Sequence, residues 1–131
     1  MTEGRWELYS HPSDIGVRGR GATREEAFAQ AALALTSVIT DLEKVQPKQA
    51  VQIECKEQDD DLLFLCWLSS LLYEMDTRRM LFSRFEVKAI EGGIKAKAWG
   101  EPVEVKAATY ADLKVQRKDD GTWVAQCIVD V

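Results

Sequence analysis

One run of the chain is apolar on every side when it is wound as an α-helix. Residues 62–75 read LLFLCWLSSLLYEM. A helix that is apolar nearly all round is either a membrane span or a buried core helix. A span needs roughly 20 apolar residues, whereas this run is shorter and is bounded by three aspartates at 59–61 and by the polar residues 76–79. The pattern therefore predicts a fully buried core helix over residues 62–75, and no membrane span.

The residues before this run predict a second helix and three strands. Thr23 and Glu26 have the spacing of a capping box, in which the two side chains satisfy backbone N–H groups at a helix N-terminus. Apolar residues then recur every three or four positions as far as residues 40–41, which end this amphipathic helix. Alternating apolar and polar residues predict strands at residues 5–9, 15–21 and 45–54.

The residues after the run predict strands separated by turns. Turns with glycine at residues 91–93 and 119–121 indicate two hairpins. Strands are predicted at residues 81–90, 94–99, 103–109, 113–117 and 123–131. This order of elements predicts an α+β fold, with mostly antiparallel or mixed β-sheet layers packed around two helices. A chain of 131 residues without repeats or linkers suits a single domain spanning residues 1–131.

The charge of the chain argues against direct contact with nucleic acids or anionic membranes. The net charge is −5 and the isoelectric point is about 4.9. Proteins bind polyanions through an excess of lysine and arginine, so we expect no direct nucleic-acid partner and no membrane partner. The first residues lack the apolar run of a signal peptide, which predicts a cytoplasmic protein.

Three cysteines are too few and too far apart for a disulfide framework or a zinc motif. Cys55, Cys66 and Cys127 each lie within an apolar or strand-like stretch. We therefore expect reduced thiols in the core, which is the usual state of cysteine in the cytoplasm.

The common catalytic motifs do not occur in the sequence. There is no glycine-rich phosphate loop, no His-x-x-x-His pair and no nucleophile elbow. Because His11 is the one histidine, a Ser-His-Asp or Cys-His arrangement would depend on it, and no serine or cysteine context supports one. We therefore assign no catalytic residue and no cofactor-binding residue to the chain.

Three aspartates occupy positions that are unusual for a carboxylate. Asp14 lies in a predicted turn, and Asp41 follows the last turn of the first helix, where the helix dipole disfavours an anion. Asp130 shares a predicted strand face with Val124 and Ile128. If the three carboxylates converged, a hard divalent cation would relieve their repulsion. Each also has an ordinary interpretation, because aspartates are common in turns and at solvated ends of elements, so spacing alone leaves both interpretations open.

Three further residues could contact a ligand or a partner. His11 lies near Asp14 and could add a metal ligand or transfer a proton, although a histidine before proline is often a plain loop residue. Lys106 could touch a phosphate or a partner's carboxylate, or could be a solvated strand lysine. Arg84 could bind phosphate or pair with a glutamate on a neighbouring strand.

Taken together, these motifs resemble the archease family over the whole chain. The family's opening His-x-x-Asp-x-Gly matches residues 11–16, and its Trp-Leu-x-x-Leu-Leu-Tyr core matches residues 67–73. The other matches are the alanine-rich helix that ends in Thr40-Asp41, the FSRFEV segment at 82–87, Gly100-Glu101, the KAATY segment at 106–110 and the VDV segment at 129–131. They follow one another in the family's order.

This resemblance implies an accessory protein of an RtcB-type RNA ligase, which joins RNA ends in tRNA splicing and RNA repair. Archeases promote guanylylation of the ligase by GTP and its multiple turnover, and they are not ligases themselves. The resemblance also implies a metal site of acidic residues, which transfers to Asp14, Asp41 and Asp130, with calcium, magnesium, manganese and zinc all open as the ion. Lys106 matches a lysine thought to serve the ligase interaction, and His11 is a second partner-binding candidate.

Two departures from the family pattern and two alternative functions accompany this resemblance. The loop after Gly100-Glu101 is shorter than usual and lacks its histidine, and Ala111 stands where the family commonly has another histidine. No role is expected here for those histidines. The alternatives are a chaperone-like binding module for RNA-modifying enzymes, which needs no metal, and a self-sufficient metal-dependent phosphoesterase that uses the same carboxylates.

Overall fold

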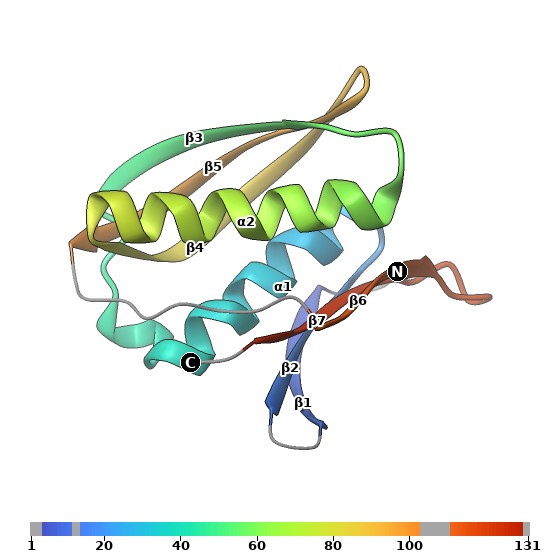
Figure 1. The fold of residues 1–131 in the computed structure, drawn as a ribbon, viewed down its shortest axis with the longest axis horizontal. Coiled ribbons are helices and arrows are strands. Elements are labelled where there is room, and N and C mark those ends of the chain that lie inside the picture. Colours follow the sequence, from blue (N-terminus) through green and yellow to red (C-terminus); the bar gives the residue numbers. More distant parts are fainter. Residues whose placement is uncertain (1–3, 12–13, 103–110, 130–131) are drawn as a thin grey trace.

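The computed structural model describes residues 4–11, 14–102 and 111–129, without the side chains of residues 11, 111–112 and 128–129. Within these residues the helices are α1 (Arg24–Ile39), α2 (Asp60–Arg78) and a 3-10 helix, η1 (Leu42–Lys44) (Figure 1). The strands are β1 (Arg5–His11), β2 (Asp14–Gly21), β3 (Gln49–Lys56), β4 (Met80–Ile90), β5 (Gly93–Pro102), β6 (Ala111–Arg117) and β7 (Trp123–Val129). The strand predicted at residues 103–109 lies outside the described residues.

The strands form two antiparallel sheets with both helices packed against them (Figure 1). One sheet has the order β1-β2-β7-β6, and the other has the order β3-β5-β4. Helix α1 contacts β1, β2 and β7 of the first sheet and β4 of the second, whereas α2 contacts β3, β4 and β6. The prediction of an α+β fold with sheet layers around two helices is confirmed. No helix of the described residues has the length and apolar character that crossing a membrane requires.

Helix α1 begins at the predicted capping box. The backbone N–H of Glu26 donates to Thr23 Oγ1 at 3.1 Å, and the Glu26 carboxylate accepts from the N–H of Ala22 at 2.8 Å. The helix then packs so closely on β2 that a Cβ atom at Gly19 would lie 2.1 Å from the carbonyl oxygen of Ala27. Only glycine fits at such a close approach, which explains why glycine interrupts the alternation of this strand.

Helix α2 begins within the run of three aspartates and extends beyond the predicted range at both ends. Asp59 caps it by accepting a hydrogen bond from the N–H of Asp61 at 3.1 Å. Its large buried apolar residues belong to the core: Leu63, Phe64, Trp67, Leu68, Leu71 and Met75. The prediction that residues 62–75 are fully buried is wrong, because Tyr73 is 65% exposed and Leu62 is 47% exposed. These two residues share the flank of the helix that the two sheets leave in contact with solvent.

The segment before β3 differs from the predicted strand over residues 45–54. Helix η1 precedes it, and the strand begins only at Gln49. Pro47 lacks the N–H that a strand interior needs. In addition, the carbonyl oxygen of Val45 accepts a hydrogen bond from Ser83 Oγ at 2.8 Å. The turn chemistry of this segment therefore outweighs its apolar alternation.

The three cysteines are free thiols, which confirms the prediction that they form no disulfide framework. Cys55 and Cys127 are buried, and Cys66 is partly exposed. The Sγ atoms of Cys55 and Cys66 lie 3.6 and 3.9 Å from the same Ser70 Oγ. Burial raises the pKa of the Cys55 thiol to about 12, and the neighbouring Cys66 adds to this rise. Cys55 is therefore protonated and unreactive at neutral pH.

We expect Cys55 to resist alkylation in the folded protein. At pH 8, iodoacetamide should modify it about a hundredfold more slowly in native protein than in urea-unfolded protein, because the thiolate is the reactive form. Peptide mass spectrometry of timed samples follows each cysteine separately, and rapid labelling of native Cys55 would contradict its burial. Because the folded-state pKa is raised, the stabilising contribution of this thiol should fall as pH rises from about 8.5 towards 12.

Candidate functional site

Asp14, the first predicted metal ligand, is the first residue of β2. It stands opposite His11 of β1 in the register of the hairpin. The side chain is partly buried and forms no hydrogen bond or ion pair with any residue that the structure describes. Within the described part of the chain, this carboxylate therefore has no structural partner and is open to an added ligand.

Asp41, the second predicted ligand, lies between the end of α1 and the start of η1. It is the N-cap residue of η1 but makes no side-chain capping bond. Its side chain is 77% exposed, and its Oδ2 lies 3.7 Å from Lys44 Nζ. An exposed pair of this kind contributes little to stability, so this carboxylate is also accessible to a ligand.

The topology brings the start of β2, which carries Asp14, and the end of α1, which precedes Asp41, to one end of the first sheet. Helix α1 follows β2 through a short connection and packs back along it, with the backbone of Ala31 close to Gly19. The end of α1 therefore lies towards the start of β2. On the opposite edge of β2, β7 runs antiparallel, and Val129 is paired with Ile15. The start of β2, the end of α1 and the last described residue of β7 thus share one end of the molecule.

Three of the predicted site groups are not placed by the structure. Asp130, Lys106 and the side chain of His11 lie outside the described residues, so their roles stay predictions. Among the residues that are described, no group of three or more histidine, cysteine, aspartate or glutamate side chains could hold a metal ion. Asp14 and Asp41 alone provide two carboxylates. Because calcium takes six to eight oxygen ligands, these two side chains do not complete a calcium site by themselves.

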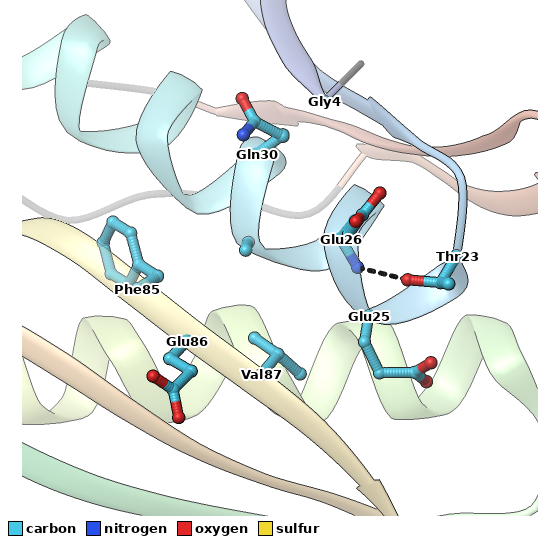
Figure 2. Close-up of a pocket in the computed structure, with 9 residues that line it drawn as sticks. Gly4, Thr23, Glu25, Glu26, Gln30, Phe85, Glu86 and Val87 are labelled. Carbon is cyan, nitrogen blue, oxygen red and sulfur yellow. Dashed lines mark hydrogen bonds between the residues drawn. The ribbon is translucent and has the colours of Figure 1, made fainter. Parts of the chain in front are cut away.

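An acid-lined hollow at the start of α1 is a separate candidate that sequence reasoning missed (Figure 2). It has a volume of about 370 Å³ and lies between α1 and β4, with Glu25, Glu26 and Glu86 in its walls. Glu26 caps α1, and Glu25 accepts a hydrogen bond from Arg24 Nε at 2.6 Å. Glu86 lies 3.4 Å from Lys88 Nζ. Because each carboxylate already has a partner, we assign these groups to structure rather than to catalysis.

A model of the archease protein family (MTH1598/TM1083) matches residues 6–131 of the chain. The chain belongs to the archease family. Among the archeases that it resembles, Protein archease of Pyrococcus abyssi is 41% identical and that of Thermococcus gammatolerans is 40% identical, each over 140 residues. Both matches cover 97% of this chain and 99% of the relative.

Solved archease-like structures share the fold of this chain. Protein 1598 of Methanobacterium thermoautotrophicum, determined in solution, has a TM-score of 0.83 and 32% identity, and the match covers 96% of this chain and 98% of the other. An archease of Thermotoga maritima, called a possible chaperone, has a TM-score of 0.59 and 16% identity, with coverage of 95% and 96%. The second likeness shows the fold alone. The predicted family is confirmed.

The outer face of the first sheet in this archease-family chain carries a polar network that was not predicted. Arg18 stacks over the ring of Tyr9 at 4.3 Å and donates from Nε to Gln126 Oε1 at 2.7 Å. Arg20 Nε donates to Glu7 Oε1 at 2.7 Å. Burial alone would raise the pKa of Glu7, but the hydrogen bond and charge of Arg20, with the charge of Arg18, lower it. No local signal could pair residues on β2 with residues on β7.

Arg84 stacks on an aromatic ring instead of pairing with a glutamate among the described residues. Its guanidinium lies over the ring of Trp99, 4.7 Å from the ring centroid. The two residues stand opposite each other in the register of β4 and β5. A cation–π contact of this kind contributes about 0.5–1 kcal/mol at an exposed site. Finding it from sequence would have required the register of the hairpin.

Proposed function

We propose that the chain is a non-catalytic accessory protein of an RtcB-type RNA ligase. In this role it promotes guanylylation of the ligase by GTP and multiple turnover of the ligase in tRNA splicing and RNA repair. Membership of the archease family supports the proposal, because its members act with that ligase and are generally known as non-catalytic accessory proteins. GTP would be bound by the ligase and not by this chain.

The observation that carries the proposal is the common position of the start of β2, which bears Asp14, and the end of α1, which precedes Asp41. The start of β2 and the end of α1 lie at the same end of the first sheet, where Val129 is paired with Ile15. Asp130 follows Val129 directly in the sequence. Asp130 lies outside the described residues, so its place in this site is part of the proposal.

These carboxylates suit a divalent metal ion, with calcium, magnesium, manganese and zinc all open as the ion. Hard cations such as calcium and magnesium prefer oxygen donors. Asp14 has no partner among the described residues, and the described partner of Asp41 is the exposed Lys44, so both side chains can accept a cation. When bound, the ion would supply positive charge at an acidic end of the protein that can dock beside the ligase's nucleotide.

We assign Lys106 and His11 to partner binding. A lysine meets a partner's carboxylate or phosphate as a point charge, which fits the motif that Lys106 matches. His11 stands opposite Asp14 in the register of β1 and β2. His11 would therefore act at or near the end of the protein that carries Asp14, whereas Lys106 lies outside the described residues.

Guanylylation of a purified RtcB-type ligase tests the proposal. With radiolabelled GTP, the rate of covalent labelling of the ligase should rise when this chain is added, and the chain itself should stay unlabelled. The archease from the same source as the ligase serves as the positive control. The proposal fails if that control stimulates the ligase and this chain does not.

A chaperone-like binding module is the second candidate, because the Thermotoga maritima protein with this fold is called a possible chaperone. The solvent-facing flank of α2, with Leu62 and Tyr73, would then bind RNA-modifying enzymes through exposed apolar surface. This function predicts that the chain suppresses aggregation of such an enzyme without added metal and without Asp14. The ligase proposal predicts instead that stimulation of the ligase depends on both the metal and Asp14.

A further inference from the structure

The outer face of the second sheet concentrates positive charge. We define the basic face as the exposed side chains on one side of β3, β4 and β5. The strand register assigns them to this side, because directly paired residues of an antiparallel sheet share a side. Its charged members are the cations Lys56, Arg84, Lys88, Lys95 and Lys97 and the acids Glu54 and Glu86, all of them exposed.

The basic face is open to solvent because the core lies on the other side of the sheet (Figure 1). Along β5, the buried Ile94, Ala96 and Ala98 alternate with the exposed lysines. Both helices pack on the buried side, so no described element covers the lysines. The net charge of −5, from which we expected no nucleic-acid partner, is a total for the whole chain and does not reveal that positive charge is concentrated on this face.

The positions of the lysines are unfavourable for the sheet alone. Lys88 and Lys95 stand directly opposite each other in the register of β4 and β5, and like charges at such positions destabilise a sheet. Lys88 Nζ lies 3.4 Å from Glu86. Lys95 and Lys97 form no ion pair with any described residue, although Glu54 stands opposite Lys95. A bound polyanion would relieve the repulsion that the free sheet carries.

The row of lysines on β5 ends beside Trp99, whose ring is stacked with Arg84. Trp99 follows Lys97 on the same side of β5, and alternate residues of a strand are about 6.6 Å apart. The guanidinium of Arg84 covers the Trp99 ring at 4.7 Å, and a hollow of about 280 Å³ lies beside Lys95 and Lys97, with Glu86 also in its wall. Proteins bind single-stranded nucleic acid with this combination, because cationic side chains contact phosphates while aromatic rings or guanidinium planes stack on bases.

We propose that the basic face binds single-stranded RNA. Lys88, Lys95 and Lys97 contact phosphates, and the stack of Arg84 on Trp99 contacts a base. An acidic protein would use the lysines but would have no need of the stack, so the stack favours RNA. The proposal does not depend on the ligase proposal, because the basic face and the aspartate end lie on different sheets.

Fluorescence anisotropy with a labelled oligouridylate of about twelve nucleotides tests the proposal. At low salt the unmodified protein should bind the RNA saturably, and the Lys95→Gln/Lys97→Gln variant should bind about tenfold more weakly. The control variant Lys114→Gln/Lys118→Gln removes the same charge from β6 and the following loop, and should change the affinity less than about twofold. Losing two phosphate contacts should also lower the slope of log affinity against log salt by about 1.4.

The Trp99→Leu variant separates RNA from other polyanions. It keeps every lysine and should weaken RNA binding about tenfold, since a base loses its stacking partner. Unchanged affinity would overturn the assignment to RNA, because the face would then recognise charge alone. The proposal is also overturned if the unmodified protein does not bind the RNA, if both double variants lose affinity equally, or if polyglutamate binds more tightly than the RNA. Circular dichroism confirms that each variant is folded.

Discussion

We expect the Trp67→Ala substitution to lower the free energy of unfolding by about 3–5 kcal/mol, as for other fully buried aromatic residues. Trp67 is 0% exposed, and its Nε1 donates to the carbonyl oxygen of Phe28 at 3.0 Å. Its ring packs against that of Phe85 in a T-shaped arrangement, with the centroids 6.0 Å apart. The substitution therefore leaves a cavity between α2, α1 and β4. Urea unfolding followed by circular dichroism measures the loss.

Tyr73→Ala on the same helix is the matched control. Because Tyr73 is 65% exposed, its removal should change the free energy of unfolding by no more than about 0.5 kcal/mol. Trp67→Phe keeps an aromatic ring but loses the hydrogen bond to Phe28, so its effect should lie between the other two. Equal urea midpoints for Trp67→Ala and Tyr73→Ala would contradict the packing of α2.

We also expect Asp14→Asn and Asp130→Asn each to weaken the stimulation of ligase guanylylation about tenfold or more. An amide keeps the shape of the side chain but removes the negative charge that holds a divalent cation. The folded state should be unaffected by Asp14→Asn, since that carboxylate has no partner among the described residues. The rate of labelling of the ligase by radiolabelled GTP is the measurement, and calorimetric titration with calcium should show the same loss.

Asp119→Asn controls for the change in net charge. Asp119 is exposed in the connection between β6 and β7, so its substitution should leave both ligase stimulation and metal binding unchanged. Full stimulation by Asp14→Asn and Asp130→Asn would exclude the carboxylates from the activity. If the unmodified protein stimulates the ligase but does not bind metal, the result would instead favour a role of the carboxylates in partner contact alone.

The sequence predicts those elements whose signals are local. The start of α1 depends on the capping box of Thr23 and Glu26, which are three residues apart. The hairpin between β4 and β5 depends on Gly92, whose φ of 77° favours glycine. The exposed flank of α2 has no local signal, because the packing of sheets that are remote in sequence decides which side of an apolar helix meets solvent. For this reason Leu62 and Tyr73 were wrongly predicted to be buried.

The sequence and its family motifs propose the residues of the candidate site, but they do not give its geometry. Asp14 and Asp41 were selected by their unusual positions and by the family motifs they match. Their elements share one end only because α1 returns along β2, which spacing does not reveal. The basic face was missed for a related reason. Lys88 and Lys95 lie on one side because of the β4–β5 register, whereas composition reports only the total charge.

The pairing of β2 with β7 also bears on the order of folding. Arg18 bonds to Gln126, which is 108 residues away in the chain. In contrast, β3, α2, β4 and β5 follow one another and contact one another. Closing a long loop loses chain entropy before its contacts form. The unit of β3, α2, β4 and β5 should therefore assemble early, and the pairing of β2 with β7 should form only in a late step.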